Sequence, residues 1–175
     1  MKSDDKQTLT EEVLRRAKKI KLLLMDCDGV LTDGRLYYTD AGEQMKVFHV
    51  RDGQGLVSWH KAGFRSGIIS GRDAKKILEK RATELGIHYI KACSVEKTRD
   101  FEDILQDAKV ASDEVAYIGD DIGDISLLKK VGLPIAVNDA VSELNSYIIY
   151  KTKLKGGLGA VREVTDLLLK AKKNT

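Results

Sequence analysis

The sequence has very little cysteine and proline and no long apolar run. Only two of its 175 residues are cysteine, Cys27 and Cys93, and one is proline, Pro134. A disulfide-stapled scaffold and a proline-rich linker are therefore excluded, and the two thiols favour a reducing compartment. Since no stretch is apolar enough for a signal peptide or a membrane helix, we expect a cytoplasmic protein without a membrane partner.

The sequence also lacks an excess of either charge. Its 30 basic and 27 acidic residues give a net charge of +3 at pH 7, and 6% of residues are aromatic. No segment interleaves basic and aromatic residues, so no nucleic-acid partner is expected. Basic residues cluster at 15–19 and 170–173 on helical patterns. We interpret these clusters as solvated helix faces, with an anionic partner as the weaker alternative.

What the sequence does contain is a regular alternation of strand and helix patterns. This alternation is typical of an α/β protein with a mostly parallel, three-layered sheet, and the length suits a single domain, 1–175. Strands at 35–38 and 44–50 predict a β-hairpin flap at about 34–50, and a glycine-rich segment with a helix occupies about 155–173. Further strands are expected at 22–25, 65–69, 88–92, 115–118, 135–137 and 146–150, and further helices at 8–19, 56–61, 73–85, 95–108 and 122–131.

Two aspartates, Asp26 and Asp28, directly follow the apolar run at 22–25. The run is long enough for a buried parallel strand, and open α/β sheets bind ligands at the carboxyl ends of such strands. A buried carboxylate without a cation or donors costs several kcal/mol, so the pair indicates a metal site or a catalytic role. A turn built on Gly29 is the alternative, and this motif alone does not decide between the two.

Further polar residues follow the other expected strands. Because the carboxyl ends of parallel strands meet at one edge of a sheet, we expect these residues to converge with the first two aspartates. A cluster of carboxylate oxygens suits Mg²⁺, which prefers substrates that carry phosphate, whereas the three histidines show no zinc-ligand spacing. The residues expected to converge are Asp26, Asp28, Ser70, Lys97, Asp120, Asp121 and Asp124.

These residue types together support phosphoryl transfer. A Mg²⁺ held by Asp26 and Asp120 would let a phosphate approach a carboxylate that otherwise repels it. Asp26 would attack phosphorus, while Asp28 would protonate the leaving alcohol and later deprotonate water. Ser70 and Lys97 would bind the phosphoryl oxygens.

Four segments resemble the signature motifs of the haloacid-dehalogenase-like (HAD) phosphatases, which have a Rossmann-like fold. The segments are 26–33, 70–72, Lys97 and 119–124, in the order that the family has them. Four motifs in register over about a hundred residues are far more specific than any one of them.

This resemblance implies a role for each matching residue. It makes Asp26 the nucleophile and Asp28 the acid/base, and it assigns Ser70 and Lys97 to the phosphoryl group. The implied Mg²⁺ ligands are Asp26, the backbone carbonyl of Asp28, and Asp120, with Asp121 and Asp124 in support.

Many members of the family carry a substrate-selecting cap domain. Here the first gap between motifs holds only the hairpin, and the second has no room for a cap. With its segments 48–53 and 156–164, the chain is similar over nearly its whole length to the capless subfamily of 3-deoxy-D-manno-octulosonate 8-phosphate (KDO 8-phosphate) phosphatases. That likeness implies hydrolysis of a sugar-acid phosphate in lipopolysaccharide precursor synthesis. It also implies a homotetramer in which the hairpins pack together, a neighbouring subunit covers each site, and a C-terminal segment can enter it.

The subfamily likeness also implies a set of substrate contacts. Arginine is a good bidentate partner for carboxylate and phosphate, although Arg72 and Arg81 are also compatible with ordinary surface charge. His49 departs from the asparagine common in the subfamily, which leaves the sugar specificity open. The implied contacts are Asp28, His49, Val50, Arg51, Asp52, Gly53, Arg72, Arg81, Lys97 and Asp121.

Three alternatives stay open. The substrate of a hydrolase of this kind is either the eight-carbon or a nine-carbon keto-sugar acid phosphate. A protein that binds phosphorylated ligands without turnover is a different class, although intact Asp26, Asp28 and Lys97 argue against it. Phosphomutase-like transfer is the weakest reading, because the relatives that perform it resemble capped enzymes.

Overall fold

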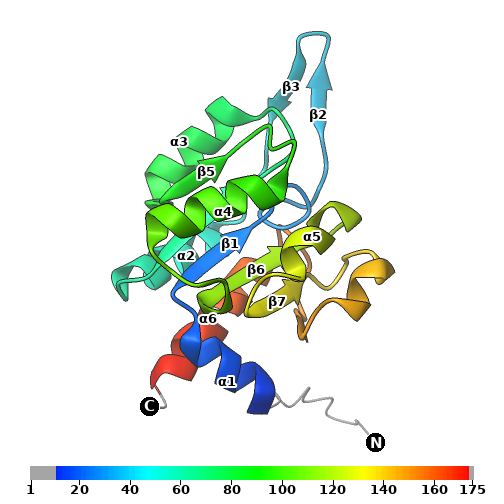
Figure 1. Ribbon diagram of the computed structural model, residues 1–175. Helices are drawn as coiled ribbons and strands as arrows, with labels where there is room; N and C mark the ends of the chain where they lie inside the picture. Colours follow the sequence, from blue (N-terminus) through cyan, green and yellow to red (C-terminus); the bar gives the residue numbers. More distant parts are fainter. Residues whose placement is uncertain (1–10, 174–175) are drawn as a thin grey trace, which may run out of the picture.

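The computed structural model describes residues 11–173, and their central element is one six-stranded sheet (Figure 1). The strand order is β5-β4-β1-β6-β7-β8, and all neighbouring strands in this sheet run parallel. An antiparallel pair, β2 and β3, forms a hairpin that projects from the rest of the molecule at the top of Figure 1. The strands are β1 Leu22–Met25, β2 Tyr37–Thr39, β3 Gly42–Met45, β4 Arg65–Ile69, β5 Tyr89–Lys91, β6 Val115–Gly119, β7 Leu133–Ala136 and β8 Tyr150–Lys151.

Helices cover both faces of the sheet. Successive residues of a strand point to opposite faces, so Leu23 and Met25 of β1 join the core formed with α1, α2, α3 and α6. Leu22 and Leu24 join a second core with α4 and α5. Strand β1 is therefore buried on both faces, which is why it appears in the sequence as a continuous apolar run. The helices are α1 Glu11–Lys19, α2 Val50–Lys61, α3 Lys75–Leu85, α4 Lys97–Ala108, α5 Ile125–Leu128 and α6 Ala160–Lys173.

This arrangement confirms the predicted three-layer α/β fold with a mostly parallel sheet. The hairpin is confirmed as well, although its second strand ends at Met45 rather than near residue 50. The start of the helix predicted at 8–19 lies partly outside the described residues, and α1 is described from Glu11. Within residues 11–173, no helix combines the length and the apolar character needed to cross a membrane.

The boundary between the hairpin and α2 was predicted wrongly. Helix α2 begins at Val50 instead of residue 56, after His49, whose Nδ1 accepts a hydrogen bond from the Arg51 N–H at 3.1 Å. Glycine is unfavourable in helix interiors, so Gly53 and Gly55 led the sequence analysis to place the start of this helix too late. In the structure a Cβ on Gly55 would clash with α6, so close packing of the two helices explains why glycine stands there.

Two further predicted boundaries are wrong. The helix expected at 122–131 is a 3₁₀ turn, Ile122–Asp124, followed by the short helix α5. The edge strand expected at 146–150 is the two-residue strand β8, which begins at Tyr150, and the preceding 3₁₀ helix ends at Ser146. Both errors lie in short elements, whose periodic patterns span too few residues to fix their ends.

Candidate active site

Three carboxylates meet at the carboxyl edge of the sheet. Asp26 directly follows β1 and Asp120 directly follows β6, and these strands are neighbours with Met25 opposite Ile118. Asp124 joins them from the 3₁₀ turn after β6. One ligand atom from each of the three side chains lies within 4.8 Å of the others. The structure therefore brings together the two strand ends that the sequence predicted to converge.

Lys97 connects two of these carboxylates. It is the first residue of α4, and its Nζ donates to Asp26 Oδ2 at 2.7 Å and to Asp124 Oδ1 at 2.8 Å. Asp124 is fully buried and also accepts a hydrogen bond from the Tyr117 hydroxyl at 2.7 Å and from the backbone N–H of Asp120 at 2.9 Å. Asp124 is thus fixed by these three donors, while Lys97 holds the side chain of Asp26.

Burial and mutual repulsion raise the pKa of the clustered acids. Burial, with help from Asp124, raises the pKa of Asp26 to about 6 against the opposing effect of Lys97. Burial and the charges of Asp124 and Asp26 raise the pKa of Asp120 to about 8. Burial opposes the charged form of Lys97, but Asp124 and Asp26 raise its pKa above the ordinary value. When its three carboxyl groups are ionised, the cluster holds more negative charge than Lys97 neutralises, which is why ionisation is disfavoured there.

The geometry fits a hard divalent cation. Oδ1 of Asp120 is buried, and within the described residues it accepts no hydrogen bond. A buried carboxylate oxygen without a donor is costly unless a cation takes the place of the donor. The three carboxylates supply oxygen ligands and no sulfur or imidazole, which suits Mg²⁺ or Ca²⁺ better than zinc.

The second aspartate of the first motif lies beside this cluster with a different set of partners. Asp28 Oδ1 accepts a hydrogen bond from Lys46 Nζ at 2.5 Å, and Arg72 Nε lies 3.8 Å from Asp28 Oδ2. Arg72 also donates to the hydroxyl of Tyr38 on the hairpin at 2.9 Å. The sequence analysis missed Lys46 and Tyr38. The available signal was the alternation of apolar residues around Lys46, which places it on the opposite face of the hairpin from Met45 and Val47.

A cavity of about 350 Å³ opens onto these groups. Ser70 follows β4 and is buried, and its Oγ is 3.4 Å from the Arg72 backbone N–H, which donates to it. The cavity, called the acid pocket below, brings together every predicted catalytic residue. Its polar side chains are Asp26, Asp28, Ser70, Arg72, Lys97, Asp120 and Asp121.

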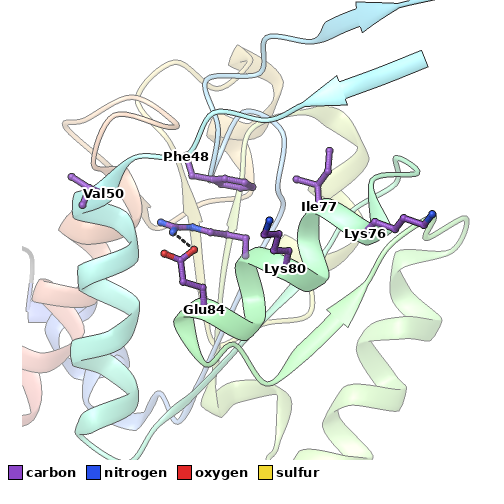
Figure 2. Close-up of a pocket in the computed structure, with 7 residues that line it drawn as sticks. Phe48, Val50, Lys76, Ile77, Lys80 and Glu84 are labelled. Carbon is purple, nitrogen blue, oxygen red and sulfur yellow. Dashed lines mark hydrogen bonds and ion pairs between the residues drawn. The ribbon is translucent and has the colours of Figure 1, made fainter. Parts of the chain in front are cut away.

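Other predicted substrate contacts lie outside the acid pocket. Val50 and Arg81 line a second cavity of about 620 Å³, between the end of the hairpin and α3 (Figure 2). There the guanidinium of Arg81 lies 5.4 Å from the centre of the Phe48 ring and forms an ion pair with Glu84 at 2.8 Å. Within one chain, implied substrate contacts therefore lie in two separate cavities. Neither cavity is lined by the remaining implied contacts, which are His49, Arg51, Asp52 and Gly53.

His49, Asp52 and Gly53 have structural roles in this chain. The His49 side chain caps α2, and Gly53 allows close approach of the Arg81 guanidinium. Asp52 is buried, and its two carboxylate oxygens accept hydrogen bonds from the N–H groups of Gly159, at 3.2 Å, and Arg162, at 2.8 Å. Both oxygens of this carboxylate therefore bind the start of α6, and a substrate contact by Asp52 stays a prediction.

Comparisons with known proteins agree with this geometry. The family model of haloacid dehalogenase-like hydrolases matches residues 72–158. The chain is 42% identical over 163 residues to the 3-deoxy-D-manno-octulosonate 8-phosphate phosphatase KdsC of Escherichia coli K12, an alignment that covers 93% of this chain and 86% of that protein.

Solved structures show the same likeness. The 3-deoxy-D-manno-octulosonate 8-phosphate phosphatase of Yersinia pestis superposes with a TM-score of 0.90 at 42% identity, covering 93% of this chain and 88% of that one. The corresponding Moraxella catarrhalis phosphatase, solved with magnesium ion, phosphate ion and KDO, superposes with a TM-score of 0.89 at 36% identity and covers 94% of each chain. The chain therefore belongs to the haloacid dehalogenase-like hydrolases, in the group of the 3-deoxy-D-manno-octulosonate 8-phosphate phosphatases.

Proposed function

We propose that this chain is a Mg²⁺-dependent phosphomonoesterase that hydrolyses KDO 8-phosphate to KDO and phosphate. The observation that carries the proposal is the convergence of Asp26, Asp120 and Asp124 with Lys97 on the Asp26 carboxylate. The relatives' printed activity and the magnesium, phosphate and KDO in the Moraxella structure support the choice of cation and substrate.

The metal would be held by Asp26, Asp120 and the backbone carbonyl of Asp28, with Asp124 and Asp121 in support. When bound, Mg²⁺ supplies positive charge that offsets the repulsion between the phosphate and the carboxylates. Lys97 keeps one oxygen of Asp26 in place, and Ser70 and Lys97 offer donors to the phosphoryl oxygens.

The chemistry then divides between two aspartates. A carboxylate oxygen of Asp26 attacks phosphorus, the bond from phosphorus to the ester oxygen breaks, and the leaving oxygen takes a proton from Asp28. In the second half, Asp28 takes a proton from a water molecule as its oxygen attacks the aspartyl phosphate. The bond from phosphorus to Asp26 breaks, inorganic phosphate leaves, and Asp28 is protonated for the next turnover.

The substitution Asp26→Asn tests this function. We expect wild-type protein with Mg²⁺ to release phosphate from KDO 8-phosphate, and Asp26→Asn to lower kcat at least about 10³-fold, because the amide is not a nucleophile. Asp103→Asn, which changes a largely exposed aspartate paired with Lys91 outside the acid pocket, is the matched control and should retain activity. Absence of phosphate release across a panel of sugar phosphates would favour a protein that binds without turnover.

The preferred substrate needs its own measurement. Specificity is a ratio of kcat/KM values, so eight-carbon and nine-carbon keto-sugar acid phosphates should be compared on one preparation. We expect the eight-carbon substrate to be preferred, and a higher kcat/KM for a nine-carbon substrate would overturn this part of the proposal. Phosphate that reappears on another carbon, instead of free phosphate, would indicate a mutase.

We also propose a homotetramer in the cytoplasm. The division of the implied substrate contacts between two cavities supports assembly, since a neighbouring copy could unite them. Both cysteines are free thiols, with Cys27 buried and Cys93 exposed, as is usual in a reducing compartment.

A further inference from the structure

Lys46 is a lysine in an unusual place. It directly follows strand β3 of the hairpin, and its side chain has 0% exposure, while its neighbours Met45 and Val47 are each 48% exposed. Lysine is almost never fully buried unless it is paired, because removing its ammonium from water is costly. The hairpin here turns its apolar side chains outward and its lysine inward.

The buried ammonium group points at one carboxylate of the acid pocket. Lys46 Nζ lies 2.5 Å from Asp28 Oδ1, and the same pocket places Lys97 Nζ 2.7 Å from Asp26 Oδ2. Each of the two aspartates of the first motif therefore has its own lysine. One comes from the hairpin and the other from the start of α4.

This pairing separates two carboxylates that have different tasks. Asp26 and Asp28 stand two residues apart on one loop, and a cation in the pocket would attract both. Among the described residues, the carboxylates placed to share an ion are those of Asp26, Asp120 and Asp124, and Asp28 is not among them. The ammonium on Oδ1 of Asp28 would keep that side chain apart from the three ion-binding carboxylates.

We propose that Lys46 is a positioning residue that orients Asp28 for proton transfer to the leaving oxygen. The inference rests on the proposed phosphatase function and assigns a task to the hairpin within its own chain. Arg72 adds a weaker restraint, since its Nε is 3.8 Å from Asp28 Oδ2 and its NH2 donates to the Tyr38 hydroxyl. The hairpin thus reaches Asp28 directly through Lys46 and indirectly through Tyr38 and Arg72.

The test compares two leaving groups in Lys46→Met and in wild-type protein at saturating Mg²⁺. A misplaced Asp28 affects an ester whose alcohol must be protonated, whereas p-nitrophenyl phosphate has a leaving group that needs little protonation. Asp28 also serves the later hydrolysis of the aspartyl phosphate, which is the same for both substrates, so the readout is kcat/KM, which covers only the steps up to departure of the leaving group. We expect Lys46→Met to lower kcat/KM on the sugar phosphate about 10²-fold. On p-nitrophenyl phosphate, kcat/KM should fall less than about fivefold.

Two further variants separate positioning from general damage. Lys46→Arg keeps a charged donor and should restore at least about a tenth of the wild-type kcat/KM on the sugar phosphate. Lys91→Met removes a lysine that pairs with Asp100 and Asp103 outside the acid pocket, and it should leave both activities unchanged. Thermal melts identify any variant that fails to fold, in which case Lys46→Gln replaces Lys46→Met.

The outcomes distinguish this inference from the proposed function. Equal losses of kcat/KM on the two substrates in the folded variant would overturn the role of Lys46 while leaving the phosphatase assignment intact. Wild-type protein that releases phosphate from neither substrate would overturn the proposed function itself. A selective loss on the sugar phosphate, partly restored by arginine, supports the inference.

Discussion

At the scale of single residues, Asp120 combines a strongly raised pKa with a buried carboxylate oxygen that accepts no hydrogen bond within the described residues. Burial and neighbouring carboxylates raise its pKa from 3.8 to about 8, and the pKa of Asp26 is raised to about 6. A carboxyl group whose pKa is raised by folding contributes stability below its unfolded-state pKa, and that contribution is lost as the pH rises through the folded-state pKa. The metal-free protein should therefore lose stability between about pH 4 and pH 8.

A prediction about Mg²⁺ follows, because the cation needs the ionised carboxylates and protons compete with it. Apparent affinity should weaken roughly tenfold per pH unit below the pKa of Asp120. We expect a fixed Mg²⁺ concentration to raise the melting temperature more at pH 8 than at pH 6, as measured by thermal melts. Asp120→Asn should show little Mg²⁺ effect at either pH, and equal stabilisation of the wild type at both pH values would contradict the site.

The sequence predicts some residues of the acid pocket and misses others. Asp26 and Asp120 were predictable because each directly follows an apolar strand pattern, and neighbouring parallel strands end at the same edge. Lys46 was missed because a lone lysine beside apolar residues usually extends into solvent. The alternation around Lys46 indicates which face of the hairpin it lies on, but not its pairing with Asp28, because that contact forms only when the hairpin is placed beside the acid pocket.

At the scale of elements, Asp52 joins α2 to α6. Its buried carboxylate accepts hydrogen bonds from the N–H groups of Gly159 and Arg162, at the start of α6, where the helix dipole also favours negative charge. Burial raises the pKa of Asp52 despite these bonds. The contact fixes the glycine-rich segment that precedes α6 to the beginning of α2.

We predict that Asp52→Ala destabilises the protein substantially. The substitution leaves two backbone N–H groups without their acceptor, at roughly 1–3 kcal/mol for each group that stays buried. For a chain of this size, where each kcal/mol shifts the melting temperature by roughly 2–4 °C, it should fall by roughly 4–24 °C. The control is Asp166→Ala, which removes an exposed ion pair with Arg162 on the same helix and should cost less than about 1 kcal/mol. A change in Asp52→Ala no larger than in the control would contradict the capping role.

The sequence predicts which segments form helices and strands. The segment around Asp52 shows why it does not predict where α2 begins or which residues Asp52 binds. Glycines at 53 and 55 argue against a helix on propensity alone, yet α2 includes both because α6 and Arg81 approach so closely there. The resemblance implies a substrate contact for Asp52, which stays a prediction, while its contact with the start of α6 was not predicted. Its hydrogen bonds join residues more than a hundred positions apart, and such a partner is invisible to local sequence patterns.

At the scale of the whole molecule, the hairpin presents apolar side chains to solvent. An exposed apolar cluster of this kind is typical of an interaction surface. The hairpin also stands apart from the sheet and its helices in Figure 1, so its outward face has few contacts within the described chain. The exposed apolar residues of the hairpin and the start of α2 are Leu36, Tyr37, Tyr38, Met45, Val47 and Val50.

The proposed tetramer makes this surface testable. Light scattering during gel filtration should give about four times the mass of the 19.4 kDa chain, and Val47→Glu should shift the protein toward smaller species, because burying an unpaired carboxylate in an interface is costly. Lys61→Glu, at the far end of α2, changes charge away from the hairpin and should leave the assembly intact. Dissociation should also lower activity on KDO 8-phosphate. Val50 and Arg81 line a different cavity from the catalytic aspartates, and we expect a neighbouring subunit in the tetramer to bring the two cavities together. If the dissociated Val47→Glu variant keeps the wild-type kcat/KM, one chain contains the complete site. A monomeric wild-type protein would also contradict a site completed by a neighbour.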